Sequence, residues 1–255
     1  RSSFGETGYQ NALADALTFR DERGEPVKYS TRKLPDPKLQ WSPRVGFNWD
    51  ASGDRTTQVR GGSGIMSGPP LYVWISNQIG NTGVLTGFTD VSNTTAFPFN
   101  PNTNAYKPAS VTGAPAATYE LALTDPNFTF PQVWRSNLAI DRKLPGGVVG
   151  TVEVLYNRDV NGVYYINANL TPPNARFTGA DARPRWTSAA ANRLNANIAN
   201  ATVLKNQNVG RSWHASVALE KTLERGFVKA GYSYGEAKNT VDAGSIAFGS
   251  WSGNQ

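Results

Sequence analysis

The stretch QWSPRVGFNWDASGDRTTQVRGGSGI, residues 40–65, decides the fold class of this chain. Trp41, Val45, Phe47 and Trp49 fall on one parity, and most residues between them are polar. Successive side chains of a β-strand point to opposite faces of the sheet, so this segment predicts a strand with one apolar and one polar face. The apolar face requires a cover, which is either a second layer of protein or lipid.

A hairpin follows directly from the same stretch. Residues 51–54, ASGD, have turn chemistry, and Thr57, Val59 and Ile65 then alternate with polar residues and glycines. The glycines at positions 61, 62 and 64 weaken a strand, so they predict a bulge or bend here. They do not match a phosphate-binding loop, which needs a Lys or a further Gly and a following helix.

Two further hairpins show the same alternation. One joins 132–144 to 148–158 through PGG, and the other joins 212–222 to 227–238 through LERG. With shorter candidates at 70–78 and 162–170, the chain predicts about eight strands.

Very long connections alternate with these tight turns. Residues 86–131 and 171–211 are rich in Pro, Asn and Thr, and an alanine-rich part of the second, 188–201, predicts one short helix. Connections longer than about 15 residues are uncommon in compact domains. Short turns at one rim and long loops at the other are typical of outer-membrane β-barrels, although soluble Greek-key sandwiches also have unequal loops.

Composition supports strands and excludes several other classes. Only 17% of the 255 residues are charged, 25 are Gly and 16 are Pro, and Cys is absent, which excludes disulfides and thiolate metal sites. The net charge of +6 is scattered along the chain. No apolar run approaches the about 20 residues of a spanning helix, so insertion would be by strands, which is compatible with a mean hydropathy of −0.44.

The residues also resemble a known family. The stretch KLPDPKLQWSPRVGFNWDASGDRTTQVRGGSGIMSGPPLYVWISNQIGNTGVLTGF, residues 33–88, is similar to the barrel of TonB-dependent outer-membrane receptors of the Oar-like group, which carry a carboxypeptidase-regulatory-like domain. FRDERGEPVKY at 19–29 matches ahead of it, and the segments 152–170 and 211–239 resemble later hairpins of the same barrel. The likeness covers most of residues 10–240 and is weaker in the loops.

The resemblance implies a fold, a location and partners. It implies an all-β chain whose antiparallel hairpins form part of a transmembrane barrel, 22-stranded in the family, with long extracellular loops, in the outer membrane of a Gram-negative bacterium. It implies a plugged lumen, an imported ligand and a TonB-type energy-coupling protein reached through the plug region. The chain shows no plug domain, TonB box, signal peptide or aromatic closing strand, since it ends SWSGNQ. We therefore expect residues 1–255 to be a partial barrel domain.

On this interpretation each strand has a lipid side and a lumen side. We expect the lipid-facing residues to be Trp41, Val45, Phe47, Trp49, Val59, Leu138, Ile140, Val152, Val154, Val217, Leu219 and Tyr232. We expect the lumen-facing residues to be Arg44, Arg60, Arg135, Glu153, His214, Glu220 and Lys229. Aromatic residues in the long loops are the expected ligand contacts: Phe97, Phe99, Tyr106, Phe128, Phe130 and Trp186.

Aromatic residues on the strands allow two interpretations. Trp41 and Trp49 lie at opposite ends of one apolar face, and Trp134, Tyr156, Trp213, Tyr232 and Tyr234 lie near the ends of others. Such rings favour the two membrane boundaries of a barrel, but they would equally fill the core of a sandwich.

No residue pattern predicts catalysis. His214 is the only histidine, it shares the polar parity with Ser212 and Ser216, and no nucleophile elbow, paired carboxylates or calcium loop accompany it. We therefore expect no enzyme activity, no cofactor, no metal and no nucleic-acid partner. Two alternatives remain: a soluble β-sandwich that binds carbohydrate through exposed aromatics, and a hydrolase on a β scaffold that depends on His214.

Overall fold

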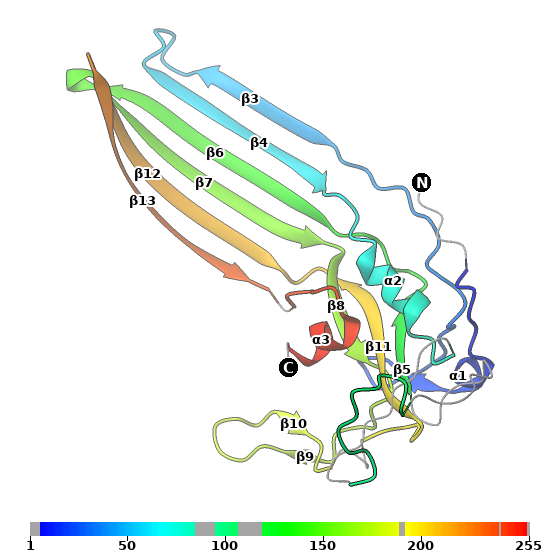
Figure 1. Ribbon diagram of the computed structural model, residues 1–255. Coiled ribbons are helices and arrows are strands. Elements are labelled where there is room, and N and C mark those ends of the chain that lie inside the picture. The colour runs from blue at the N-terminus through cyan, green and yellow to red at the C-terminus, as the bar shows by residue number, and fades with distance from the viewer. Residues whose placement is uncertain (1–5, 85–94, 107–118, 189–191, 240, 254–255) are drawn as a thin grey trace.

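The protein consists of a long curved antiparallel sheet and a smaller compact body at one end of it (Figure 1). The computed structural model describes residues 6–84, 95–106, 119–188, 192–239 and 241–253. The long sheet has six strands in the order β13-β12-β7-β6-β4-β3. They are β3 (Arg44–Asp50), β4 (Thr57–Ser67), β6 (Gln132–Leu144), β7 (Val148–Val160), β12 (Arg211–Leu223) and β13 (Gly226–Lys238).

Three tight turns lie together at the end of the sheet far from the body. In the first, the carboxylate of Asp50 accepts hydrogen bonds from the backbone N–H groups of Gly53 and Arg55. In the second, the 3₁₀ turn Pro145–Gly147, two glycines adopt positive φ angles that side chains disfavour. The third joins Leu223 to Gly226. The three hairpins predicted from the alternation are confirmed.

The glycine-rich part of β4 is a regular strand, so the expected bulge is wrong. β4 pairs residue by residue with β6 from Thr57 to Ser67. The glycine at 61 is needed for close approach, because a Cβ there would lie 2.9 Å from both the carbonyl oxygen of Asn137 and the ring of Phe47. The ring of Phe47 thus covers the bare backbone of its cross-strand partner.

The compact body is built on a second sheet that the sequence did not reveal. Its strands are β5 (Tyr119–Thr124), β11 (Ile198–Gln207) and β8 (Gly162–Asn167), with β11 in the centre, parallel to β5 and antiparallel to β8. The other elements of this end are α1 (Ala12–Ala16), β1 (Phe19–Arg20), β2 (Pro26–Val27), α2 (Val73–Gly80), β9 (Ala175–Arg176), β10 (Pro184–Arg185) and α3 (Ala247–Ser252).

Apolar side chains are buried on both faces of this second sheet. On one face Leu121 and Val203 pack with Phe19 of β1. On the other, Ala122 and Leu204 pack with Trp74 of α2 and Ala247 of α3. The body therefore has its own hydrophobic core, whereas the long sheet extends away from it as a single layer (Figure 1).

Several expectations for this end of the chain were wrong. Residues 70–78 were expected as a strand, but Val73–Gly80 is helix α2, with Trp74, Ile75 and Gln78 buried on one side. The helix expected within 188–201 is absent from the described part of that segment, where β11 begins at Ile198. The long connections 86–131 and 171–211 contain β5 and the whole of β11, and the strand expected at 162–170 joins the second sheet as β8.

The long sheet is open within the described part of the chain. Its outer strands, β3 and β13, each pair on one side only and not with each other. The antiparallel, mostly β architecture was predicted correctly, while the closed 22-stranded barrel implied by the resemblance is not seen. Among the described helices, none is long and apolar enough to cross a membrane.

Candidate functional site

The long sheet has one apolar and one polar face along its full width. Antiparallel partners share a face, so the register sorts the side chains directly. One row across all six strands is entirely apolar: Trp49, Val59, Ile140, Val152, Val217 and Tyr232. The next row contains Phe47, Gly61, Leu138, Val154, Ala215 and Tyr234.

These apolar side chains are not covered by the described part of the protein. Leu138, Val152 and Val217 are each about half exposed, at 50%, 50% and 49%. A sandwich would have buried them under a second sheet, so the alternative of an aromatic and aliphatic sandwich core does not fit this sheet. Eleven of the twelve residues expected to face lipid lie on this face; Trp41 lies ahead of β3, outside the strands.

The opposite face carries the residues expected to line a lumen. The register places all seven of them there: Arg44, Arg60, Arg135, Glu153, His214, Glu220 and Lys229. Arg60 donates to Asp141 over 2.8 Å and lies 3.9 Å from Glu153. Asp141 also accepts a hydrogen bond from the hydroxyl of Thr151, 2.6 Å away. Lys229 and Glu220 form a second ion pair of 3.4 Å, so part of the charge on this face is paired within the sheet.

Cations limit the apolar face at both ends of the strands. On β12, Arg211 and Lys221 lie on this face with only Trp213, Ala215, Val217 and Leu219 between them. At about 3.4 Å per residue the two cations are about 34 Å apart along the strand, which a tilt of about 40° reduces to about 26 Å. The apolar band of an outer-membrane barrel is about 25 Å tall. On β12 the uncharged stretch therefore matches the thickness of a membrane, whereas Arg142 of β6 and Glu236 of β13 each lie one row inside these limits.

Aromatic residues gather at one limit of this band. Trp134 and Tyr156 make an edge-to-face contact with ring centroids 6.4 Å apart, and Trp213 and Tyr234 make another at 5.8 Å. Both pairs lie toward the compact body. Tyr232, expected near a strand end, instead lies in the middle of β13, whereas Trp49 lies next to the end of β3, as expected. Described aromatic residues thus form a girdle at one limit of the band.

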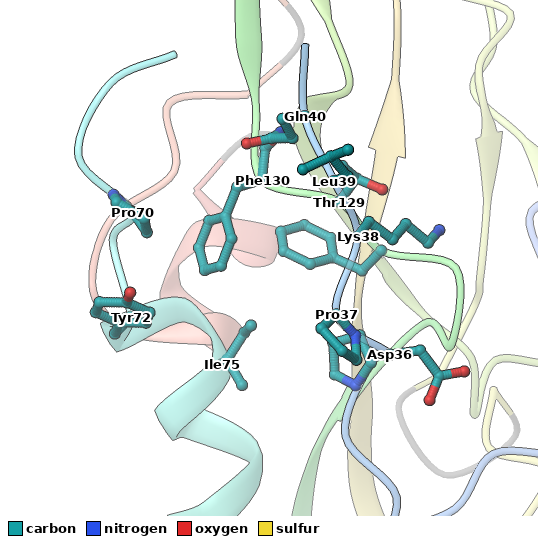
Figure 2. A pocket seen from close by; sticks show the side chains of 12 residues that line it. Asp36, Pro37, Lys38, Leu39, Gln40, Pro70, Tyr72, Ile75, Thr129 and Phe130 are labelled. Atoms are coloured by element: carbon teal, nitrogen blue, oxygen red, sulfur yellow. The ribbon is translucent and has the colours of Figure 1, made fainter. Parts of the chain in front are cut away.

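A cavity of about 350 Å³ lies in the compact body next to the long sheet (Figure 2). Its walls come from the extended segment 35–40, the start of α2 and the chain that follows β5. Phe130 is central: its ring lies 5.7 Å from that of Tyr72 and 5.6 Å from that of Phe128, both edge to face. Asp36, Lys38 and Gln40 also line this space, with the charged ends of Asp36 and Lys38 pointing away from it in Figure 2. The cavity is thus lined by apolar rings and polar residues in similar measure, and it is large enough for a small ligand.

The six expected ligand contacts are not brought together. Phe128 and Phe130 line the cavity of Figure 2, although Phe128 is only 3% exposed and belongs to the core. Phe97 and Tyr106 contact each other, and Phe99 is almost fully exposed. The indole of Trp186 donates to the carbonyl of Thr171 and borders a different cavity of about 390 Å³. The contact between Phe130 and Tyr72 could not be read from the sequence, because 70–78 was interpreted as a strand.

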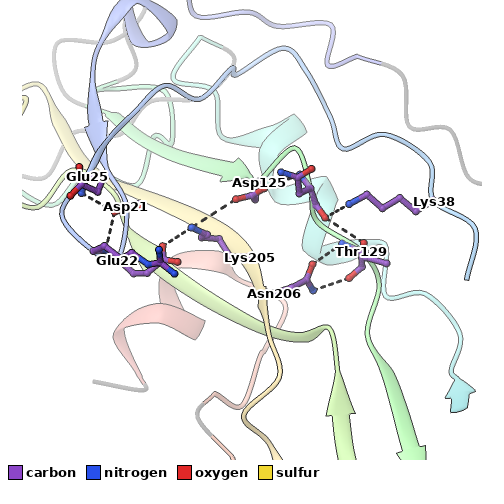
Figure 3. A network of polar contacts seen from close by, with 10 residues as sticks. Asp21, Glu22, Glu25, Lys38, Asp125, Thr129, Lys205 and Asn206 are labelled. Atoms are coloured by element: carbon purple, nitrogen blue, oxygen red, sulfur yellow. Dashed lines mark hydrogen bonds and ion pairs between the residues drawn. The ribbon is translucent and has the colours of Figure 1, made fainter.

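A buried lysine joins three segments of the compact body (Figure 3). Lys205 of β11, with a side chain only 13% exposed, lies 2.5 Å from the carboxylate of Glu22 and 3.8 Å from that of Asp125. Burial raises the pKa of Glu22, but hydrogen bonds from Lys205 and Tyr164 and the charge of Lys205 outweigh burial and lower it. Burial and the hydrogen bond to Glu22 raise the pKa of Tyr164. The lysine thus fixes the β1–β2 turn to the central strand.

His214 lies on the polar face of β12, between Leu155 of β7 and Gly235 of β13. Among the described residues, no hydrogen bond or ion pair joins it to another side chain, so no triad is formed there. No cluster of three or more His, Cys, Asp or Glu residues suited to a metal ion occurs in the described ranges. The hydrolase alternative therefore has no supporting geometry in the described sheet.

Comparison with known proteins gives a family match. The model of the family "Outer membrane beta barrel domain" matches residues 3–254, which is nearly the whole chain. No curated protein and no solved structure matches the chain.

Proposed function

The chain belongs to the outer membrane β-barrel domain family and is located in the bacterial outer membrane; on that premise we propose that it forms part of the barrel wall of a TonB-dependent receptor. Its function is to bind a ligand at the outer side and to allow its passage through a plugged lumen. No residue of the chain performs covalent chemistry in this proposal.

The observation that carries the proposal is the uninterrupted apolar row of six side chains from Trp49 to Tyr232. Four of the strands, β6, β7, β12 and β13, have 13 residues each, and about 9–11 tilted residues suffice to cross a bilayer. The apolar face contacts lipid, and the face with Arg60, Asp141 and Glu153 contacts water. Lipid is thereby the partner of one whole face.

The open edges of the sheet support a wall that continues on both sides. Each unpaired backbone N–H or C=O group costs several kcal/mol in hydrocarbon, so membrane-spanning sheets are closed. β3 and β13 each present one unpaired edge in the described structure. Further strands beside them complete the barrel in this proposal. The strand number implied by the resemblance, 22, belongs to the same proposal.

The compact body is the outer, ligand-binding side. Longer connections of outer-membrane barrels are extracellular and short turns are periplasmic, and all long connections of this sheet lead into the body. The cavity around Phe130 and Tyr72 is the ligand contact that the structure favours over the exposed Phe97 and Phe99. A TonB-type protein supplies energy from the periplasmic side, as the resemblance implies.

Single cysteines test the orientation of the sheet, and the chain has none of its own. Val217→Cys and Ser216→Cys place thiols on opposite faces at neighbouring positions of β12. In outer membranes, a spin label on the Val217→Cys variant should be relaxed by lipid-soluble oxygen, and one on the Ser216→Cys variant by a water-soluble nickel complex. The same relaxation behaviour in both variants, or the reverse assignment, contradicts the membrane-wall proposal.

Energy coupling is tested separately in whole cells. The full-length protein carrying a photo-crosslinker in its plug region should capture the TonB-type protein, and ligand-stimulated capture should change when a protonophore collapses the proton gradient. If the barrel inserts correctly but never crosslinks to the coupling protein, the result agrees with the outer-membrane location and contradicts the assignment as a TonB-dependent receptor.

A further inference from the structure

A row of cations crosses three strands at the limit of the apolar face next to the compact body. Arg158 of β7 lies directly opposite Arg211 of β12, and Arg211 lies directly opposite Lys238 of β13. On its other side, Arg158 has Trp134 of β6 as its cross-strand partner. Arg158 and Arg211 are both exposed. Three positive side chains thus stand next to one another at this limit of the apolar face, with Glu236 beside Trp213 in the adjoining row.

The sheet neutralises only part of this charge. Lys238 forms an ion pair of 2.8 Å with Glu236, which is also within electrostatic reach of Arg211. Arg158 has no ion-pair partner among the described residues. Like charges directly opposite in a sheet destabilise it, so this row is an unfavourable arrangement for the isolated protein. An external anion at the row would remove the repulsion.

From this juxtaposition we propose that the row Arg158–Arg211–Lys238 binds the phosphate groups of lipopolysaccharide, the phosphorylated glycolipid of the outer leaflet. The inference rests on the proposed function, because it takes the apolar face as the lipid side and the compact body as the extracellular side. Lipid fills the space beside the row in that orientation, and the headgroup phosphates lie where the uncharged band ends.

The neighbouring residues fit a glycolipid headgroup. The aromatic pair Trp134 and Tyr156 lies beside Arg158, and Trp213 is the next residue after Arg211 on the same face of β12. Amphipathic rings prefer the membrane boundary, and arginine binds phosphate through two parallel hydrogen bonds. Beyond the rings, the apolar face continues toward the acyl chains. Anion, sugar and acyl chain thus each meet a matching surface.

The other end of the same face offers a matched control. Arg142 of β6 and Lys221 of β12 also end the apolar band, but at the end with the tight turns. Neither of them has a cation as a cross-strand partner. Arg142 pairs with Thr57 and Gly150, and Lys221 pairs with Val148 and Val228. Replacing them removes the same charge from the same face on the periplasmic side.

The test uses the full-length protein in nanodiscs that contain lipid A, the phosphorylated anchor of lipopolysaccharide, or lipid A from which both phosphates have been removed. Each cation near an anionic lipid surface contributes about fivefold to binding. We expect R158Q/R211Q to weaken lipid A binding by about 25-fold, with R142Q/K221Q unchanged and dephosphorylated lipid A bound equally weakly by all forms. R158K/R211K should stay within about threefold of the unmodified chain.

Three results would overturn the inference: equal binding of phosphorylated and dephosphorylated lipid A, an equal loss in R142Q/K221Q, or full competition by millimolar inorganic phosphate, which would indicate a site for the free ion. Insertion is checked on each sample by heat-dependent electrophoretic mobility. If the unmodified chain does not insert into the membrane, the proposed function fails as well. If it inserts but the substitutions in the cation row leave lipid A binding unchanged, only this inference fails. Should R158Q/R211Q not insert, R158Q and R211Q are measured singly, each with an expected fivefold loss.

Discussion

Val152 and Val217 face each other directly across strands β7 and β12, and half of each residue is exposed. Paired valines in the middle of a sheet are normally covered, because each buried methylene contributes about 0.8 kcal/mol. Here the cover is lipid in the proposed orientation. The pair therefore lies where the sheet is most sensitive to charge.

Replacing Val217 with arginine should lower the free energy of unfolding from lipid vesicles by about 2–4 kcal/mol, the cost of a cation on the lipid face near mid-bilayer. The matched control is Ser216→Arg, one position along the strand and on the polar face beside Glu153. That change should cost less than about 1 kcal/mol. Urea unfolding followed by tryptophan fluorescence measures both. Equal costs at the two positions would be incompatible with one lipid face and one wet face.

The Arg60–Asp141 ion pair should be screened by water. A double-mutant cycle with R60Q and D141N measures its coupling energy, which we expect to be about 1 kcal/mol or less, as for other partly exposed pairs. Raising the salt concentration should reduce the coupling. A coupling energy of several kcal/mol that does not change with salt concentration would indicate that this face lies in lipid or in a dry core.

Gly61 should tolerate no side chain. Gly61→Ala brings the new Cβ to 2.9 Å from the backbone oxygen of Asn137 and from the ring of Phe47, so we expect a loss of about 1–3 kcal/mol of stability. Gly46→Ala is the control, because its Cβ would lie 3.4 Å from the nearest atom, the carbonyl oxygen of Gly61. Folding into detergent micelles, followed by circular dichroism against urea, compares the two. Equal stability of the two variants would show that the ring of Phe47 moves away freely.

Acid should loosen the N-terminal hairpin before the rest of the compact body. The pKa of Glu22 is lowered from its ordinary value of 4.5, so its ion pair with Lys205 stabilises the fold fully above that value and is lost as the pH falls through the lowered one. The protection of residues 19–27 against hydrogen exchange, corrected for the intrinsic exchange rate at each pH, should therefore fall on acidification. In Lys205→Met the part of this pH dependence that belongs to Glu22 should disappear. The part from Asp21 should remain, because its pKa is also lowered and its carboxylate accepts hydrogen bonds from the backbone N–H groups of Arg23 and Glu25.

Glu25→Gln removes a carboxylate from the same hairpin without removing the partner of Lys205. Its exchange should follow that of the unmodified chain at every pH. If Lys205→Met keeps the full pH dependence, a group other than Glu22 is responsible.

Sequence reasoning succeeded where a strand has one wet face. In β6, β7, β12 and β13 the apolar residues recur at every second position, and the bounds expected from this alternation agree with the structure within a few residues. The side on which each residue of the long sheet lies could be predicted for the same reason. Which side meets lipid depends on what surrounds the sheet and remains a prediction.

Sequence reasoning failed for strands of which both faces are buried. β5 and β11 are covered on both sides, so Leu121, Ala122 and Leu123 are apolar in succession and no alternation marks the strand. The alanine-rich residues before and within β11 favour a helix locally, but pairing with β5 and β8 overrides this preference. In 70–78 the short apolar run YVWI fits either period, and burial of Trp74, Ile75 and Gln78 selects the helix.

The candidate site was predicted only in part for a similar reason. Phe128 and Phe130 were named, but their neighbour Tyr72 comes from a distant segment whose secondary structure was misjudged. The row of cations is visible only once the register brings Arg158, Arg211 and Lys238 side by side from three strands.

The central position of β11 links two connections that are far apart in the chain. It pairs with β5, from the connection between β4 and β6, and with β8, from the connection between β7 and β12. Separating these connections would break the ladder between β5 and β11 and expose Val203 and Leu204. In the proposed receptor, an opening that keeps this ladder intact would move the whole body as one unit, hinged where the chain leaves the long strands.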